Sequence, residues 1–310
     1  MIEFHDVSKT FAGEPAVSNL DLTFAEGAFS VLVGTSGSGK STTLKMINRL
    51  VEHDSGLIRF AGQEIRSLPV LELRRRMGYA IQSIGLFPHW TVARNIATVP
   101  QLQKWSRQKI DDRVDELMAL LGLDPGLRER YPHQLSGGQQ QRVGVARALA
   151  ANPEVLLMDE PFGALDPVTR SALQLEMTRI HRILGRTIVL VTHDIDEALR
   201  LADHLVLMDS GRVVQQGTPL ALLTQPANGF VREFFGRSEL GVRLLSLRTV
   251  GESMRPEITP GECPLRASMS LRDALSAFVS QGCESLPVLD EQDKPCGTLW
   301  FRDLLAREAS

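Results

Sequence analysis

Residues 34–41 read Gly34-Thr35-Ser36-Gly37-Ser38-Gly39-Lys40-Ser41. This run matches the pattern of a phosphate-binding loop, in which small residues let the backbone N–H groups of residues 37–42 approach phosphate oxygens. Lys40 would place a compact positive charge between the two outer phosphates, and the Ser41 hydroxyl is the expected ligand of a magnesium ion. The run therefore predicts a site for a nucleoside triphosphate.

The segments around this loop have the order that a true phosphate-binding loop needs. An apolar strand is predicted at Phe29–Val33 and a helix at Lys40–Leu50. The N-terminus of such a helix directs free N–H groups and the positive end of its dipole at the phosphates. Apolar runs at Val155–Met158 and Thr187–Val191, separated by a helical pattern at Val168–Leu184, are typical of buried parallel strands. The fold class is therefore predicted to be α/β.

The run Val155–Met158 leads directly into two acidic residues, Asp159 and Glu160. A carboxylate at the end of a buried strand can hold magnesium, so Asp159 is expected to complete the metal site with Ser41. Glu160 would then face the outermost phosphate, where a carboxylate can polarise the attacking water and accelerate hydrolysis by roughly 10²–10⁴. Together with the glycine-rich loop, these acids predict a nucleoside triphosphatase.

A third motif, Leu135-Ser136-Gly137-Gly138-Gln139, lies between the loop and the acidic strand. Ser136 is a suitable N-cap for a helix predicted at Gly138–Ala151. With the three motifs in this order, the chain resembles the ATP-binding subunit of an ATP-binding-cassette (ABC) transporter over residues 1–235. The resemblance implies a P-loop NTPase cassette, with a mixed sheet core and a helical subdomain at about residues 83–150.

The resemblance also implies that ATP and Mg²⁺ are held between two copies of the chain, arranged head to tail. Ser136 and the N–H groups of Gly137 and Gly138 would contact the γ-phosphate held by the other copy, a task that suits a helix N-terminus. Asp166, in Gly163-Ala164-Leu165-Asp166, would cross the same interface. The residues expected to bind ATP are Phe11, Gly34, Thr35, Ser36, Gly37, Ser38, Gly39, Lys40, Ser41, Thr42, Ser136, Gly137, Gly138, Gln139 and Asp166.

Three further side chains take their roles from the resemblance. His193, in Thr192-His193-Asp194, corresponds to a histidine that contacts the γ-phosphate and helps to position the water. Gln82 corresponds to a glutamine that reaches the magnesium and the water, on a loop that touches the membrane subunit. Phe11 corresponds to the aromatic residue on which adenine stacks, with packing in the core as the alternative. The expected catalytic residues are Glu160, His193, Gln82 and Lys40, and the expected metal ligands are Ser41, Gln82 and Asp159.

The chain is expected to act with membrane partners without crossing the membrane itself. It has no apolar run of the roughly 18 residues that a spanning helix needs, and its net charge of −3 indicates no nucleic-acid partner. Phe87 and Trp90 would form a socket for a short helix of a transmembrane permease subunit, or else pack locally. A substrate-binding protein would act only indirectly. The resemblance places the chain on the cytoplasmic side of a bacterial inner membrane, and the basic run Arg74–Arg76 is predicted to be a solvated helix face.

The sequence after Phe235 changes in character. Glycine and proline crowd residues 236–262, which are predicted to be a linker. Residues 263–310 resemble a single CBS motif, a small α+β module, with Ser270 as the predicted N-cap of its helix. Gly297 and Asp303 match the nucleotide-binding pattern of such modules, but Trp300 stands where a threonine or serine is usual. Nucleotide binding and a purely structural role in dimerisation both stay open, and the module is expected to pair with its copy in the second subunit.

Three classes of protein fit parts of this sequence. An importer ATPase is favoured over a soluble ABC ATPase of DNA repair or translation, because the chain has neither a long heptad-rich insertion nor a second cassette. A non-enzymatic nucleotide sensor is disfavoured by the intact Lys40, Asp159, Glu160 and His193. Residues 43–50 and 73–82 resemble the quaternary-amine osmoprotectant importers, which take up glycine betaine and related solutes. Importers of polyamines, sulfonates or another small solute stay open, because no residue of such an ATPase contacts the cargo.

Overall fold

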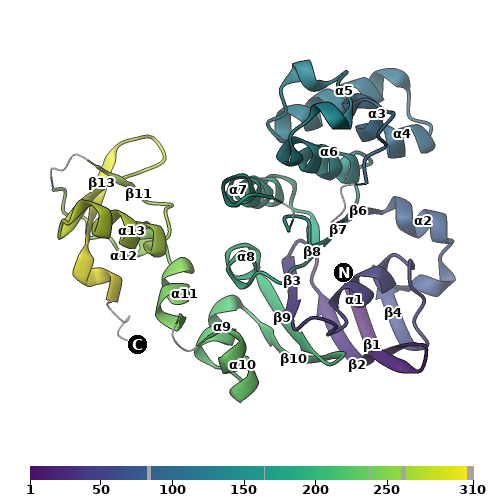
Figure 1. The fold of residues 1–310 in the computed structure, drawn as a ribbon, viewed down its shortest axis with the longest axis horizontal. Helices are drawn as coiled ribbons and strands as arrows, with labels where there is room; N and C mark the ends of the chain where they lie inside the picture. Colours follow the sequence, from purple (N-terminus) through teal and green to yellow (C-terminus); the bar gives the residue numbers. More distant parts are fainter. Residues whose placement is uncertain (82–84, 164, 237–238, 260–262, 306–310) are drawn as a thin grey trace. The chain divides into compact units, whose positions relative to one another are not determined.

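The computed structural model describes residues 1–81, 85–163, 165–236, 239–259 and 263–305 (Figure 1). The chain divides into two compact units, Met1–Thr218 and Pro219–Ser310. Within the described ranges, no helix is both long and apolar enough to cross a membrane. The fold of each unit follows from its own pattern of buried residues.

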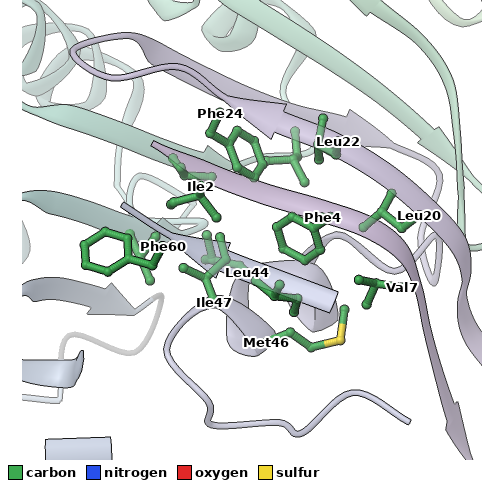
Figure 2. Close-up of a cluster of buried hydrophobic side chains, with 14 of the residues drawn as sticks. Ile2, Phe4, Val7, Leu20, Leu22, Phe24, Leu44, Met46, Ile47 and Phe60 are labelled. Atoms are coloured by element: carbon green, nitrogen blue, oxygen red, sulfur yellow. The ribbon is translucent and has the colours of Figure 1, made fainter. Parts of the chain in front are cut away.

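The first unit begins with an antiparallel sheet in the order β2-β1-β4-β5. Apolar side chains on one face of this sheet join the apolar side of helix α1 in a single buried cluster, which Figure 2 shows around Phe4, Leu44 and Phe60. Burial of this cluster fixes the helix that follows the glycine-rich loop. The elements are β1 Ile2–Phe11, β2 Glu14–Phe24, β4 Ser55–Phe60, β5 Gln63–Glu64, α1 Lys40–Ile47 and the 3₁₀ helix η1 Ile65–Ser67.

A second sheet of six strands carries the loops of interest, in the order β10-β9-β3-β8-β7-β6. All pairs are parallel except β10 with β9, so the sheet is mixed, as predicted. Since carboxyl ends of parallel strands meet at one sheet edge, the residues after Gly34, Asp159 and Val191 lie together there. The strands are β3 Phe29–Gly34, β6 Met77–Ile81, β7 Val155–Asp159, β8 Thr187–Val191, β9 His204–Asp209 and β10 Arg212–Gly217.

Helix α6, which begins at the Ser136 motif, contacts α3, α5 and β6. It belongs to a helical region that also contains α3, α4 and α5 (Figure 1). Helix α2 precedes β6, and helices α7 and α8 follow β7 and β8. The bounds are α2 Val70–Arg75, α3 Val92–Ile96, α4 Thr98–Leu102, α5 Arg107–Leu120, η2 Pro125–Leu127, η3 Pro132–Gln134, α6 Gly137–Leu149, α7 Pro167–Leu184 and α8 Ile195–Leu201.

Arg74 and Arg75 are exposed, as predicted for a solvated helix face, but the side chains of Arg74 and Arg76 also make contacts within the fold. Arg74 donates to the backbone carbonyls of Asn48 (3.0 Å) and Arg49 (2.8 Å), just beyond the last residue of α1. Arg76 makes two hydrogen bonds to Glu154, and its guanidinium lies 4.4 Å from the centre of the Phe60 ring. A guanidinium can satisfy orphan carbonyls and stack on an aromatic ring at once, and charge alone does not reveal either task.

The second unit places a three-stranded sheet, in the order β11-β12-β13, beside helix α13. Ser270 caps α13 as predicted, accepting a bond of 3.1 Å from the N–H of Asp273. The elements are α9 Pro219–Thr224, α10 Gly229–Phe234, α11 Leu240–Ser246, α12 Val250–Ser253, β11 Leu265–Arg266, α13 Leu271–Gln281, β12 Ser285–Leu289, β13 Pro295–Trp300 and the 3₁₀ helix η4 Phe301–Leu305.

The segment 236–262, predicted as a linker, differs from that expectation where it is described. Helices α11 and α12 lie within it, and their Leu245 and Val250 belong to the apolar cluster of the second unit. Helix α11 also contacts α9, so the contacts divide the chain after Thr218 rather than near residue 235. The glycines and prolines separate short helices here, and apolar burial holds those helices in place.

Candidate functional site

The glycine-rich loop connects β3 to α1 at the carboxyl edge of the six-stranded sheet. Two of its glycines are required by close backbone approach. A Cβ at Gly34 would lie 1.9 Å from the carbonyl oxygen of Met208, and one at Gly39 would lie 2.4 Å from that of Ala16. Both residues also have positive φ, 150° and 93°. The loop can therefore form only with glycine at these two positions.

Lys40 is buried at the first position of α1, with 7% of its surface exposed. Its ammonium donates to the carbonyls of Gly34 (3.0 Å) and Thr35 (2.7 Å) and to the Ser38 hydroxyl (3.1 Å). Burial lowers the pKa of Lys40, while the negative charges of Glu160 and Asp159 oppose that shift. The loop thus encloses a positive charge at its centre, which suits a phosphate-binding site.

Ser41 and Asp159 meet as the two motifs predict, although 118 positions separate them. The Ser41 hydroxyl donates to Asp159 Oδ1 at 2.8 Å, and the Lys45 ammonium lies 3.8 Å from Asp159 Oδ2. The described residues contain no cluster of three histidine, cysteine or acidic side chains that could hold a metal alone. One hydroxyl and one carboxylate fit Mg²⁺, which usually takes few protein ligands and completes its shell with phosphate oxygens and water.

Glu160 follows the end of β7 with a backbone conformation that is unusual for a side-chain-bearing residue. Its φ is 47°, and its N–H donates to the carbonyl of Val191 at 2.9 Å. This bond ties the residue to the end of β8, where the turn to His193 begins. Nδ1 of His193 lies 3.2 Å from Glu160 Oε2. Left-handed backbone at such a residue costs on the order of 1 kcal/mol, so the surrounding structure holds it there.

These groups surround one cavity of about 550 Å³, open beside the loop. It is lined by Ala16, Gly34, Ser36, Gly37, Ser38, Gly39, Lys40, Ser41, Thr42, Glu160 and His193. Ala16 and the nearby Lys45 were missed by motif reasoning, because neither belongs to a pattern that signals phosphate binding. Gln82 lies outside the described residues.

The predicted metal ligand Asp159 and several predicted ATP contacts lie outside this lining, among them Thr35 and Phe11. Thr35 donates from its hydroxyl to Asp209 Oδ1 at 2.7 Å, so its side chain fastens the loop to the end of β9. Phe11 is 47% exposed, with the Lys9 ammonium 5.2 Å from the centre of its ring. That exposure contradicts the alternative of core packing. An aromatic ring left at the surface retains a face on which a base can stack.

The Ser136 motif forms the N-terminus of α6 and is engaged in a capping box. Ser136 Oγ accepts from the N–H of Gln139 (3.3 Å), and the Gln139 side chain accepts from the N–H of Ser136 (2.9 Å). A Cβ at Gly138 would lie 2.4 Å from Cγ2 of Thr169 in the first turn of α7, whereas one at Gly137 would meet nothing within 4 Å. Gly137 is thus the open position of the motif, and Gly138 serves packing.

Asp166 is the N-cap of α7. Its Oδ1 accepts from the N–H groups of Val168 (3.1 Å) and Thr169 (3.0 Å), and hydrogen bonds from Thr169 lower the pKa of its carboxyl. The caps at Ser136 and Asp166 lie close together, because Thr169 touches the position of Gly138. Neither cap lines the cavity around the glycine-rich loop.

The loop, the buried lysine, the paired hydroxyl and carboxylate, and the glutamate beside a histidine define a P-loop nucleoside triphosphatase. Residues 17–163 match the family described as ABC transporter. The chain is 78% identical over 305 residues to the glycine betaine uptake system ATP-binding protein YehX of Escherichia coli (strain K12), which covers 98% of this chain and 99% of that protein. The chain therefore belongs to the ABC transporter family, as an ATPase subunit whose hydrolysis is coupled to transport.

Two further similarities agree with that assignment. The chain is 47% identical to the glycine betaine/carnitine/choline transport ATP-binding protein OpuCA of Bacillus subtilis (strain 168), over 94% of this chain and 76% of that protein. Its fold matches the dimeric structure of the ATP-binding cassette MJ0796 bound to ADP and Pi, with a TM-score of 0.63 and 32% identity, covering 71% of this chain and 99% of the other. The predicted cassette fold is thus confirmed.

Proposed function

We propose that this chain hydrolyses ATP to power the import of glycine betaine, or a related quaternary amine, through membrane-spanning partner subunits. The observation that carries the proposal is the 78% identity, over 99% of its length, to a protein named for glycine betaine uptake. Importers of polyamines or sulfonates are the alternatives. The chain would work on the cytoplasmic side of the membrane, attached through the permease, with a substrate-binding protein acting only through that permease.

The geometry of the cavity supports a division of labour among its residues. Lys40 and the N–H groups of residues 37–42 hold the phosphates, while Ser41 and Asp159, 2.8 Å apart, hold Mg²⁺. When bound, that ion neutralises developing charge on the phosphates. Glu160 orients the attacking water. His193, whose Nδ1 lies 3.2 Å from Glu160 Oε2, holds the glutamate side chain in place and contacts the γ-phosphate. Gln82 is assigned to the metal and the water by resemblance alone, because it lies outside the described residues.

The position of the Ser136 motif supports a composite site shared by two copies. Ser136, Gly137 and Gly138 lie at a helix N-terminus, where backbone N–H groups can donate hydrogen bonds to phosphate oxygens. None of the three lines the cavity of the same chain. In this proposal they contact the γ-phosphate held by a second, head-to-tail copy, and Asp166 crosses beside them. Gln139 contributes by capping the helix, since its side chain is bonded to the N–H of Ser136.

A second cavity, of about 400 Å³, supports the proposed contact with a permease. Its lining includes Tyr79, Gly85, Phe87, Val99 and Arg147. Phe87 is 38% exposed and lies 4.3 Å, centre to centre, from the ring of Trp90. Asn95 is fully buried and makes four hydrogen bonds to the backbone of Phe87, Trp90 and Thr91, which hold the aromatic loop in place. A partly apolar hollow beside such a loop is suited to a short helix of a partner.

The C-terminal module is proposed to pair with its copy in the second subunit rather than to bind a nucleotide. Both oxygens of Asp303 accept from the Arg255 guanidinium at 2.8 Å, and these bonds lower the pKa of the Asp303 carboxyl. A Cβ at Gly297 would lie 2.4 Å from the carbonyl oxygen of Arg255. The two residues that match the nucleotide pattern of a CBS motif are therefore used inside the module.

Uptake by vesicles that contain this chain with its permease and binding protein tests the cargo. We expect ATP-dependent accumulation of labelled glycine betaine, with little uptake of putrescine or taurine, at low and at high salt. A matched complex carrying Glu160→Gln should accumulate none of them. Accumulation of putrescine or taurine without glycine betaine would reject the quaternary-amine assignment while retaining transport coupled to ATP hydrolysis.

A further inference from the structure

A cluster of buried polar side chains lies behind His193, outside the cavity lining. Thr192, Glu197 and Gln174 are exposed by only 2%, 5% and 4%. Burial of polar groups costs free energy unless they are paired, so a buried set beside a functional residue needs an explanation. None of the three has a role in the proposed ATP site.

Three hydrogen bonds close a ring around the backbone of His193. The Thr192 hydroxyl donates to Glu197 Oε2. The N–H of Asp194 donates to Thr192 Oγ1 at 3.0 Å, and Asp194 Oδ1 accepts from the N–H of Glu197 at 3.0 Å. Since Thr192 and Asp194 flank His193 on both sides, this ring restricts the backbone that directs the imidazole.

Arg170 connects this ring to the segment that ends at Asp166. Its Nη1 donates to Asp194 Oδ2 at 3.4 Å, and its Nη2 donates to the carbonyl of Leu165 at 3.1 Å. Both partners of the ion pair are about one-third exposed, so water screens the pair only partly. One guanidinium therefore spans the segment proposed to cross the dimer interface and the turn that carries His193.

We propose that Arg170 and Glu197 are positioning residues. They hold the turn Thr192–Asp194, and therefore His193, in a fixed position relative to the segment before Asp166. The inference rests on the proposed role of His193 in hydrolysis. Neither residue touches the cavity, so both act on the histidine rather than on ATP. Burial raises the pKa of Glu197 to about 7, which agrees with a carboxyl whose Oε2 accepts from Thr192 while its Oε1 has no hydrogen-bond partner among the described residues.

The test combines kinetics with a direct signal from the histidine, in the full-length chain. Arg170→Met should lower kcat about tenfold and leave the Kd for ATP within about twofold of wild type. In a His193→Ala background the same substitution should change the residual rate less than about twofold, because residues that act through one another are not additive. Arg179→Met, on an exposed part of the same helix, is the matched control and should be neutral in both backgrounds.

The second measurement uses the NMR signals of the seven histidine rings in protein labelled at histidine. The His193 signal, assigned by its loss in His193→Ala, should move in Arg170→Met and Thr192→Val and stay in place in Arg179→Met and Thr192→Ser. If melting curves show that Arg170→Met does not fold, the Thr192→Val and Thr192→Ser pair is compared in the same way. An unmoved His193 signal, or an equal loss of kcat in both backgrounds, overturns the proposal. Full hydrolysis by His193→Ala would instead refute the role of the histidine, and the ring signal would still report whether it is held.

Discussion

The residues predicted to bind ATP fall into two groups that differ in how the fold uses them. The glycine-rich loop, Glu160 and His193 come from three distant segments and line one cavity. The Ser136 motif and Asp166 instead cap the helices that follow them, away from that cavity. A parallel sheet brings the loops of a single chain together at one edge. The N-termini of two helices instead direct N–H groups outward, where a second molecule can bind them. We therefore propose that the first group binds ATP within one chain, whereas the second group completes a site only with a second copy.

Glu160→Gln tests the first group and should have the largest effect. The amide keeps the shape of the side chain but cannot accept the proton of the attacking water, so we expect kcat to fall by at least about 100-fold. ATP affinity should stay within about threefold, because Lys40 and the loop are untouched. Glu116→Gln, on the exposed side of α5, serves as the control in a phosphate-release assay. Turnover near the wild-type rate would remove Glu160 from the mechanism.

The buried Glu197 behind His193 predicts a pH dependence of stability. Its pKa is raised from 4.5 to about 7 in the folded chain, so its contribution is complete below pH 4.5 and is lost as pH rises through 7. That loss amounts to about 3 kcal/mol in the free energy of unfolding. Glutamine does not ionise, so Glu197→Gln keeps this contribution at every pH. The free energy of unfolding of this variant relative to wild type should therefore rise between pH 5 and pH 8. Denaturant melts at both pH values check this, and a constant difference would contradict it.

Phe11 lies outside the cavity lining, and its substitution should have the smallest effect. Removal of an aromatic stacking partner costs about 1 kcal/mol, so Phe11→Ala should weaken ATP binding about fivefold without lowering the melting temperature. Phe11→Trp should restore the affinity. Titration with a fluorescent ATP analogue measures both variants. An unchanged Kd in Phe11→Ala would exclude the ring from the adenine site.

Much of the first unit could be predicted because local signals and global packing agree there. The strand Phe29–Val33, the glycine-rich loop and the helix from Lys40 form one continuous pattern, and the observed helix ends three residues before the predicted end. Asp159 was expected to complete the metal site with Ser41 because it ends a buried apolar strand, and the two side chains lie 2.8 Å apart. Ser136 and Ser270 both cap helices, as serine before an apolar helical pattern predicts.

The features that were missed depend on contacts between segments distant in sequence. The guanidinium of Arg76 pairs with Glu154 and stacks on Phe60, which no reading of three consecutive arginines reveals. The helices α11 and α12 form in a segment rich in glycine and proline because Leu245 and Val250 are buried against residues far along the chain. Arg170 and Asp194 likewise meet only after α7 and β8 have folded.

Mixed dimers test directly whether the Ser136 motif acts on ATP held by another copy. Gly137→Asp adds a negative charge where a Cβ meets nothing within 4 Å, so it should repel phosphate without harm to folding. Alone, Gly137→Asp and Glu160→Gln should each be nearly inactive. Mixed in equal amounts, about half of the dimers combine both chains and each retains one intact site, so about a quarter of wild-type ATPase activity should return. A mixture no more active than its two components would contradict a site shared between copies.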